Sequence, residues 1–317
     1  MKKMYLAFVA LFMVASAFSQ GVTTSSMGGK ITDATEEPLL GANVVAIHVP
    51  SGSTYGAISD FDGYFRIPNM RVGGPYRVTI SYVGFNDFVR EDVYLNLGQT
   101  ERINTNLSES ATALDEVVVT AVNDGFSSNK TGSSTNVSQR DINTLPAASR
   151  SIADFVRITP QAQITEGNDG FSISLAGQNN RYNAVYIDGA ANNDVFGLAG
   201  SGTNGGQTGV NPFSVDAIAS FQVNIAPFDV RQSGFSGGSI NAVTRSGTND
   251  WEGSVYGFVR NESLVGKTPP ALVGDGEERE KVADFSALTY GMRVGGPLVK
   301  DKLFFFLNYE RQDDETP

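Results

Sequence analysis

The sequence predicts a mostly β, multidomain chain: a small all-β sandwich, a mixed α+β domain, and the first antiparallel strands of an incomplete transmembrane β-barrel. Three observations support this prediction. In the first third of the chain, apolar residues alternate at period two between turn signals. In the middle, short capped helices occur among short strands. At the end, strands of roughly ten residues are separated by a long polar loop and a tight turn.

The composition agrees with a chain of short strands and turns. Gly occurs 35 times and aromatic residues make up 10% of the chain. Cys is absent and His48 is the only His, which argues against thiolate metal sites, disulfides, and Cys- or His-based catalysis. The net charge of −11 argues against nucleic-acid partners. We therefore predict that the protein is not an enzyme and needs no metal or cofactor.

Two short motifs resemble enzyme signatures without the context that these signatures require. Residues 200–205 fit G-x-G-x-x-G, but residues 207–212 do not have the helical pattern that dinucleotide binding needs. We interpret residues 200–205 as a mobile loop. Residues 234–238 fit G-x-S-x-G, but Ser236 has no base, since the only His lies in another module.

The N-terminus has the pattern of a secretory signal peptide. Lys2 and Lys3 precede an apolar run over residues 4–14, and Ala15-Ser16-Ala17 forms a small-residue cleavage site. The apolar run is shorter than the roughly 20 residues that a membrane-spanning helix needs. We expect residues 1–19 to be removed during export through the Sec pathway.

Residues 27–108 predict an all-β sandwich. Residues 43–47 form a β-branched strand, and Asp60-Phe61-Asp62-Gly63 is a tight turn whose Gly tolerates a positive φ. Further along, four apolar residues share one face of a strand at period two: Tyr76, Val78, Ile80 and Tyr82. Asp60 and Asp62 lack the spacing of a calcium loop, so the hairpin is the favoured interpretation.

The segment 109–123 contains a strand-prone run, residues 114–121. A Ser/Thr/Ala-rich stretch precedes this run at residues 108–112, and a long polar tract follows it at residues 127–134. It has two interpretations. It could be the last strand of the sandwich, or a lone strand that pairs with the sheet of another protein by β-augmentation. The pattern alone favours neither.

Residues 124–248 predict a compact α+β domain with about four short strands. Ser138 and Ser151 have the pattern of helix N-caps, with Ile152, Phe155 and Val156 on one face of the second helix. Ser214 is expected to cap a helical turn that contains Val215 and Ile218. The strands are expected at residues 171–175, 184–187, 221–225 and 240–244, with an Asp188-Gly189 turn after the second.

Residues 249–317 predict the first barrel strands, at residues 251–261, 285–294 and 302–311. We expect Gly295-Gly296-Pro297 to start a tight turn. In the third strand Leu303, Phe305, Leu307 and Tyr309 should point one way, and Lys302, Asn308 and Glu310 the other. Three strands cannot close a barrel, so we expect the native chain to continue past residue 317.

Several motifs, in order, resemble one family. Four segments look like a carboxypeptidase regulatory-like domain, which is Ig-like: residues 29–33, 38–44, 59–65 and 81–85. Two further segments resemble the plug domain of TonB-dependent receptors: Tyr186-Ile187-Asp188-Gly189 and residues 237–244. Residues 295–298 and 301–306 are similar to the first barrel strands of Oar-like receptors of Bacteroidota.

The resemblance extends to one binding segment. Seven consecutive residues look like the TonB box of these receptors: Asp115, Glu116, Val117, Val118, Val119, Thr120 and Ala121. This implies that the segment pairs with TonB, and it favours the lone-strand interpretation. Two plug positions depart from the usual pattern, since Leu175-Ala176-Gly177 replaces Arg-Gly and Ala226-Pro227 replaces Gly-Pro. These changes weaken any inference about the usual plug-to-barrel contacts.

The resemblance implies an outer-membrane receptor that takes up a ligand with energy relayed through TonB from the inner membrane. Its N-terminal modules would be periplasmic or inside the barrel. Its barrel strands would contact outer-membrane lipid. Substrate-facing plug residues are expected among the polar loop positions Asn179, Asn180, Asn192, Asn193 and Asp194. Glycans, peptides and metal chelates all remain open as ligands. The alternatives are a TonB-dependent signalling receptor, or a secreted carbohydrate-binding or adhesive protein that works through its Ig-like module.

Overall fold

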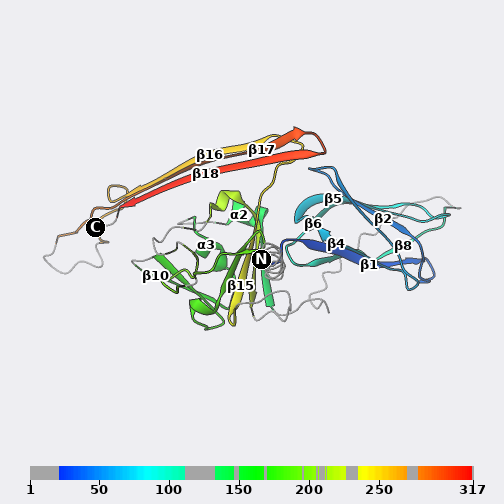
Figure 1. The fold of residues 1–317 in the computed structure, drawn as a ribbon, viewed down its shortest axis with the longest axis horizontal. Coiled ribbons are helices and arrows are strands. Elements are labelled where there is room, and N and C mark those ends of the chain that lie inside the picture. Colours follow the sequence, from blue (N-terminus) through cyan, green and yellow to red (C-terminus); the bar gives the residue numbers. More distant parts are fainter. Residues whose placement is uncertain are drawn as a thin grey trace, which may run out of the picture. The chain divides into compact units, whose positions relative to one another are not determined.

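The computed structural model describes residues 21–110, 133–145, 150–167, 170–194, 196–204, 206, 211, 213–225, 235–269 and 278–315. The chain divides into two compact units, Met1–Arg245 and Ser246–Pro317. Figure 1 shows that strands dominate both. Among the residues described, no helix is long and apolar enough to cross a membrane.

Residues 21–110 form the predicted β-sandwich. One sheet contains β4 (Tyr64–Met70), β1 (Ser25–Asp33), β7 (Thr100–Arg102) and β8 (Thr105–Leu107), and the last two both pair parallel to β1. The other sheet has the order β3 (Ser53–Ile58), β2 (Asn43–His48), β5 (Gly73–Ser81) and β6 (Phe88–Leu95), all antiparallel.

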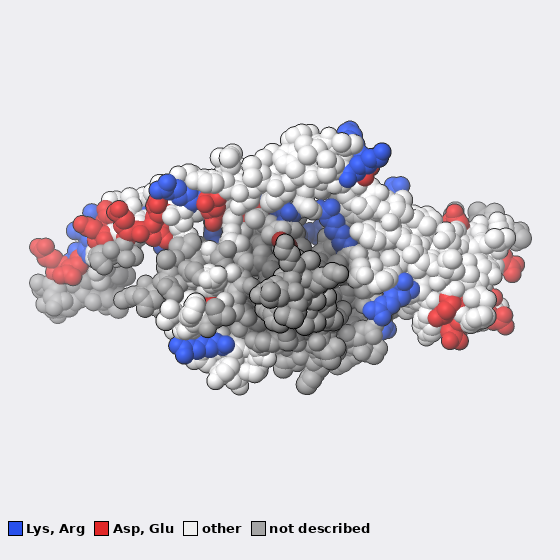
Figure 2. Space-filling model, viewed as in Figure 1, with Lys and Arg blue, Asp and Glu red and all other residues white. Residues whose placement is uncertain are grey.

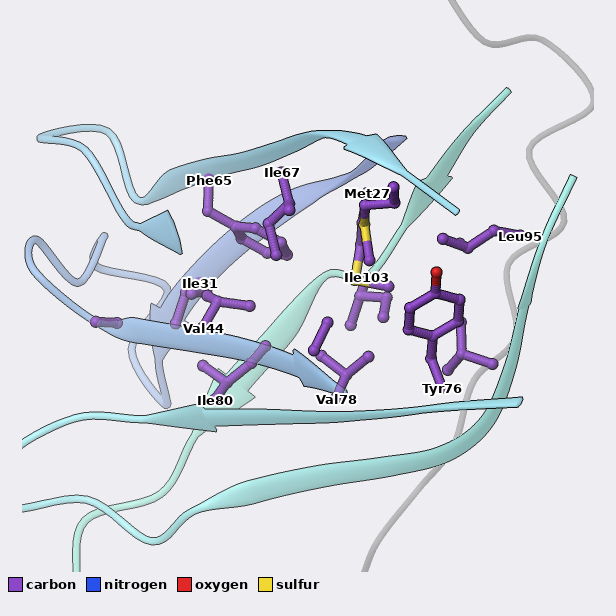
Figure 3. Close-up of a cluster of buried hydrophobic side chains, with 14 of the residues drawn as sticks. Met27, Ile31, Val44, Phe65, Ile67, Tyr76, Val78, Ile80, Leu95 and Ile103 are labelled. Carbon is purple, nitrogen blue, oxygen red and sulfur yellow. The ribbon is translucent and has the colours of Figure 1, made fainter. Parts of the chain in front are cut away.

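The core of the sandwich lies between the two sheets. Tyr76, Val78 and Ile80 are fully buried, as the alternation along β5 predicts, and they meet Met27 and Phe65 of the opposite sheet (Figure 3). The hydroxyl of Tyr76 donates to the Arg71 carbonyl at 2.7 Å, which satisfies its one polar atom. Full burial of each such apolar side chain stabilises the fold by about 1.5–3 kcal/mol.

His48 ends β2 inside this core and is only 3% exposed. Its ring lies 4.9 Å from the Tyr76 ring, and Nδ1 is 2.7 Å from the Ser51 hydroxyl. Burial, reinforced by the nearby Arg71 guanidinium, lowers the pKa of His48 to about 4. The imidazole is therefore neutral in the folded sandwich at neutral pH.

The second module of the first unit is built on a five-stranded mixed sheet. Its order is β13 (Ala190–Ala191), β12 (Ala184–Ile187), β15 (Gly238–Thr244), β14 (Ile218–Ile225) and β9 (Ser133–Ser138). β12 and β15 are parallel, and the other pairs are antiparallel. A separate hairpin joins β10 (Ala162–Gly167) to β11 (Gly170–Leu175).

The prediction of about four strands in this module is too low. Three strands were not predicted: β9, β10 and β13. Of these, β9 has the sequence SSTNVS, with Val137 as its only apolar residue. Its strand conformation comes from backbone pairing with β14, from Ser220 opposite Ser138 to Ile225 opposite Ser133. A polar edge strand of this kind leaves no hydrophobic period in the sequence.

Short helices cover one face of the sheet. The N-caps predicted at Ser138 and Ser151 are confirmed at α2 (Gln139–Thr144) and α3 (Ile152–Val156), and both form capping boxes. Phe155 of α3 packs edge-on against Phe221 of β14, with ring centroids 5.5 Å apart. Ser214 caps the 3₁₀ turn η3 (Val215–Ala217), but Ile218 is not part of it. Ile218 already pairs with Thr244 as the first residue of β14.

Two motifs from distant parts of this module meet through Asp188. The carboxylate of Asp188, just beyond β12, accepts hydrogen bonds from the Thr244 amide at 2.8 Å and the Thr244 hydroxyl at 2.7 Å. The Asp188 amide donates to the Ala242 carbonyl. Asp188 has a φ of +48°, which Asp and Asn tolerate better than other non-Gly residues.

The second unit contains the three long antiparallel strands β16 (Glu252–Asn261), β17 (Ser286–Val299) and β18 (Leu303–Glu315). Gly295-Gly296-Pro297 does not start a turn, contrary to the prediction, because β17 runs on to Val299. Gly296 pairs with Phe305 of β18, and its missing Cβ leaves room for the Trp251 ring beside the strand. The turn comes later, at Asp301, whose amide donates to the Asn249 side chain at 2.8 Å.

The register gives these strands two different faces. Val255, Met292 and Tyr309 are mutual cross-strand neighbours on one face, and all three are exposed. On the other face the Arg293 guanidinium donates to the Ser254 hydroxyl at 2.9 Å, and Tyr256 donates to Glu310. The remaining exposed apolar residues of the first face include Leu288, Tyr290 and Leu307. This is the apolar-out, polar-in alternation of outer-membrane strands.

The buried neutral His48 predicts acid sensitivity of the sandwich. Between pH 6.5 and 4 the unfolded chain binds a proton that the folded chain does not, so stability is complete above pH 6.5 and falls toward pH 4. At pH 5 this one group should cost on the order of 1–2 kcal/mol. Hydrogen exchange of β2 and β5, followed by mass spectrometry at pH 7.5 and 5, should show the loss. His48→Asn should reduce the pH dependence, and an unchanged dependence would contradict the assignment.

Asp188→Ala should destabilise the mixed sheet by about 1–2 kcal/mol, since it removes two acceptors and leaves Ala at positive φ. Asp188→Asn keeps an acceptor oxygen and tolerates the backbone, so it should lose less than half of that. Pulse proteolysis in a urea series measures both variants. Equal losses would show that the carboxylate bonds to Thr244 do not hold the two strands together.

Candidate functional site

Two loops of the mixed module lie side by side. One is residues 176–183, between β11 and β12, and the other is residues 192–206, after β13. The side-chain amide of Asn180 donates to the Gly200 carbonyl at 2.5 Å, and the Arg181 guanidinium donates to the Gly197 carbonyl at 2.8 Å. These bonds join the loops that hold all five substrate-facing positions expected from the sequence.

The side chains of these predicted residues shape the loops. Asn179 accepts from the Arg181 amide and caps the 3₁₀ turn η1 (Asn180–Tyr182). Asn193 accepts from the Val185 amide at 2.7 Å and ties the second loop to β12. Asn192 contributes its backbone, whose carbonyl accepts from the Asn204 amide at 3.1 Å.

Asp194 organises the second loop. Its carboxylate accepts from the Ala199 amide at 2.6 Å and from the Phe196 amide at 3.0 Å. These backbone donors, with Ala199 first, hold the pKa of Asp194 below its usual range, so the group is ionised at neutral pH. The Asp194 amide donates to the carbonyl of Gly202, which lies at a φ of +74° within the Gly-rich residues 200–205.

Sequence reasoning missed three side chains that these loops present to solvent. Phe196 is 82% exposed, Leu198 68% and Tyr182 53%. The sequence does contain a signal for them, because large apolar side chains stand there in a loop that is otherwise rich in Gly and Asn. Such a loop has no core in which these side chains could be buried. The arrangement is a set of exposed apolar groups on a scaffold of Asn and Asp hydrogen bonds.

The close approach of the first loop to β15 depends on two glycines. The Asn183 amide group donates to the Ile173 carbonyl at 2.8 Å, and its oxygen accepts from the Gly238 amide at 3.2 Å. A Cβ at Gly237 would lie 2.6 Å from the Asn183 oxygen. The Gly237-Gly238 motif therefore lets β15 start directly beside the loop base.

The other predicted site, the segment Asp115 to Ala121, lies outside the described residues.

Asp194→Ala should loosen the second loop. Loss of the two carboxylate oxygens that accept from the Phe196 and Ala199 amides should raise tryptic cleavage after Arg181, and amide exchange over residues 196–204, by about tenfold. Asp194→Asn, which keeps one oxygen, should give an intermediate rate. Asn192→Ala is the matched control, because no hydrogen bond to its side chain is seen from the part of the chain described. Equal rates in all three variants would refute the role of Asp194.

Three family models match the chain in succession. The Carboxypeptidase regulatory-like domain matches residues 12–108, the TonB-dependent Receptor Plug Domain matches residues 127–240, and the Outer membrane beta barrel domain matches residues 243–317. These matches cover the sandwich, the mixed module and the long antiparallel strands.

Relatives give the same assignment. The chain is 27% identical to the TonB-dependent transporter Oar of Myxococcus xanthus over 311 residues, which cover 93% of this chain and 27% of that protein. It is 30% identical to the TonB-dependent receptor SusC of Bacteroides thetaiotaomicron over 132 residues, covering 42% of this chain and 12% of SusC. The chain thus spans about a quarter of the length of Oar.

Among solved structures, the siderophore receptor PirA from Acinetobacter baumannii is similar with a TM-score of 0.41 and 24% identity, over 56% of this chain and 24% of that one. By the order of the family matches and by the sequence relatives, the chain belongs to the TonB-dependent receptors of the outer membrane.

Proposed function

We propose that the protein takes up an external ligand across the outer membrane, energised through TonB and its inner-membrane complex. The observation that carries this proposal is the order of two parts in one chain. A compact mixed-sheet domain is followed directly by long antiparallel strands with one apolar and one polar face. Such strands suit a barrel wall between lipid and a polar lumen, and a compact domain before them suits a plug.

The contact with TonB is assigned to Asp115, Glu116, Val117, Val118, Val119, Thr120 and Ala121. Three consecutive valines favour an extended backbone, and an added strand gains affinity from main-chain hydrogen bonds. Recognition of this kind needs a free N–H at each alternate position.

The contact with the ligand is assigned to the paired loops at residues 176–183 and 192–206. The predicted residues Asn179, Asn180, Asn193 and Asp194 hold the loops in shape, and Tyr182, Phe196 and Leu198 would touch the ligand. Exposed rings of this kind favour a ligand with apolar or ring faces, which glycans, peptides and aromatic metal chelates all offer.

Signalling receptors of this family usually carry an additional N-terminal βαβ-type domain. Residues 21–110 contain strands and no helix, and they form a two-sheet sandwich. This observation supports transport over signalling as the function of the chain.

Val118→Pro tests the proposal, because proline removes a backbone donor and is excluded from the interior of a paired sheet. In the full-length receptor it should weaken binding of the purified periplasmic domain of TonB by more than tenfold and abolish energised uptake. Val118→Ala should stay within a few-fold of wild type. Fractionation must show both variants in the outer membrane. Tight TonB binding by the proline variant would overturn the assignment.

A further inference from the structure

One end of the β-sandwich gathers four loops, residues 34–42, 59–63, 82–87 and 108–110. The first two are joined by the Gly41 amide, which donates to the Ser59 carbonyl at 3.0 Å, and by the Ser59 hydroxyl, which donates to the Leu39 carbonyl. The other two are joined by the Asn86 amide, which donates to the Ser108 carbonyl at 2.9 Å. Asn43 pairs with both Ile58 and Ser81, so all four loops share this end, which we call the loop end.

The loop end exposes apolar side chains that the sandwich core does not use. Val83 is 95% exposed, Phe61 81%, Ile58 69% and Leu40 45%. Single exposed apolar residues are ordinary, but a group of them at one end marks an interaction surface.

Phe61 is held outward by a rigid turn. The Asp60 carboxylate accepts from the Asp62 amide at 3.0 Å and from the Tyr64 amide at 2.8 Å, and the Gly63 amide donates to the Asp60 carbonyl. Gly63 has a φ of +76°, and a Cβ there would meet the Ile31 carbonyl oxygen. The backbone that carries the ring is therefore fixed, so binding would have to order the ring itself but little of the turn.

The charge of the loop end has one sign. Its loops contain no Lys or Arg, and their acidic residues are Glu36, Glu37, Asp60, Asp62, Asp87 and Glu109. In the part of the chain described, the ion pairs seen are between other residues. Figure 2 shows the right-hand end of the view with red carboxylates and without blue cations. Such a surface selects a partner that carries Lys or Arg beside an apolar pocket.

The chain leaves the sandwich at this same end. The Ser110 amide donates to the Gly84 carbonyl at 2.8 Å, next to the exposed Val83. Four residues lie between Ser110 and Asp115. Covalent geometry therefore limits the distance between the Cα atoms of these two residues to about 18 Å. A folded domain that pairs with Asp115 to Ala121 would therefore lie within reach of the loop end.

We propose that the loop end is a second docking surface for the TonB domain that pairs with residues 115–121. Phe61 would enter an apolar pocket on TonB, and the surrounding carboxylates would face Lys or Arg at its rim. This rests on the proposed function and adds to it, since strand pairing alone reads little side-chain identity and the loop end would supply specificity.

The test measures binding of the purified periplasmic domain of TonB to the full-length receptor in detergent at two salt concentrations. Phe61→Ser should weaken binding about tenfold or more, as expected for a central anchor. A triple variant, Glu36→Gln, Glu37→Gln and Asp62→Asn, should bind a few-fold more weakly at low salt and lose most of its salt dependence. Asp60 is left intact, because its carboxylate builds the turn.

Matched controls lie elsewhere on the sandwich. Val49→Ser changes an exposed apolar residue, 52% exposed, in the β2–β3 hairpin at the opposite end. Glu91→Gln changes an exposed carboxylate on β6 that pairs with Arg77. Both should bind as wild type, and unchanged hydrogen exchange in β4 should confirm that Phe61→Ser keeps its fold.

The outcomes separate the two proposals. Weaker binding by the Phe61 and triple variants, with both controls unchanged, supports the second docking surface. Wild-type binding by these variants, together with loss of binding in Val118→Pro, overturns the second surface and leaves the proposed function standing. Absence of TonB binding by the wild-type receptor overturns both.

Discussion

The parallel pairing of β12 with β15 is the contact on which the middle domain depends. It joins segments more than fifty residues apart and places Tyr186 beside Asn241. Every strand to either side, β13 on one edge and β14 with β9 on the other, is positioned by this pair. Because a parallel ladder cannot close through a tight turn, the chain between the two strands must leave the sheet and return. The second of the two paired loops of the candidate site, which follows β13, is part of that connection.

Small residues and short polar side chains keep this connection compact. Asp188 bonds to Thr244 where both strands end, and Asn183 bridges Ile173 and Gly238 where they begin. Asp194 then folds the following loop on itself. The backbone donors that an irregular loop would leave unpaired thus find acceptors inside the loop, which frees the apolar side chains of Phe196 and Leu198 to face outward.

Apolar and polar residues alternate at period two in the strands of all three modules, but the apolar face has a different environment in each. In the sandwich the alternation sends Tyr76 and Val78 into a core closed by a second sheet. In the mixed sheet it turns Phe221 toward the helices and Gln222 to the other face. In the long strands it exposes Met292 and Tyr309 on one face, while Ser254 and Arg293 form a hydrogen bond on the other. Whether an apolar face is buried or exposed depends on what packs against it, and the periodicity of a strand does not predict that.

The sequence by itself determined the three modules, most of their strands, and the helix caps at Ser138 and Ser151. These features depend on local periodicity and on hydrogen bonds between residues at most three positions apart. A short stretch of sequence is therefore enough to predict them. The polar strand β9, the continuation of β17 through Gly296, and the exposed Phe196 were decided only in the tertiary structure. Each depends on a partner outside its own segment: β14 for β9, Phe305 of β18 for Gly296, and the first loop, whose Arg181 bonds to Gly197, for Phe196. The composition of a segment does not reveal which distant backbone or ring it will meet.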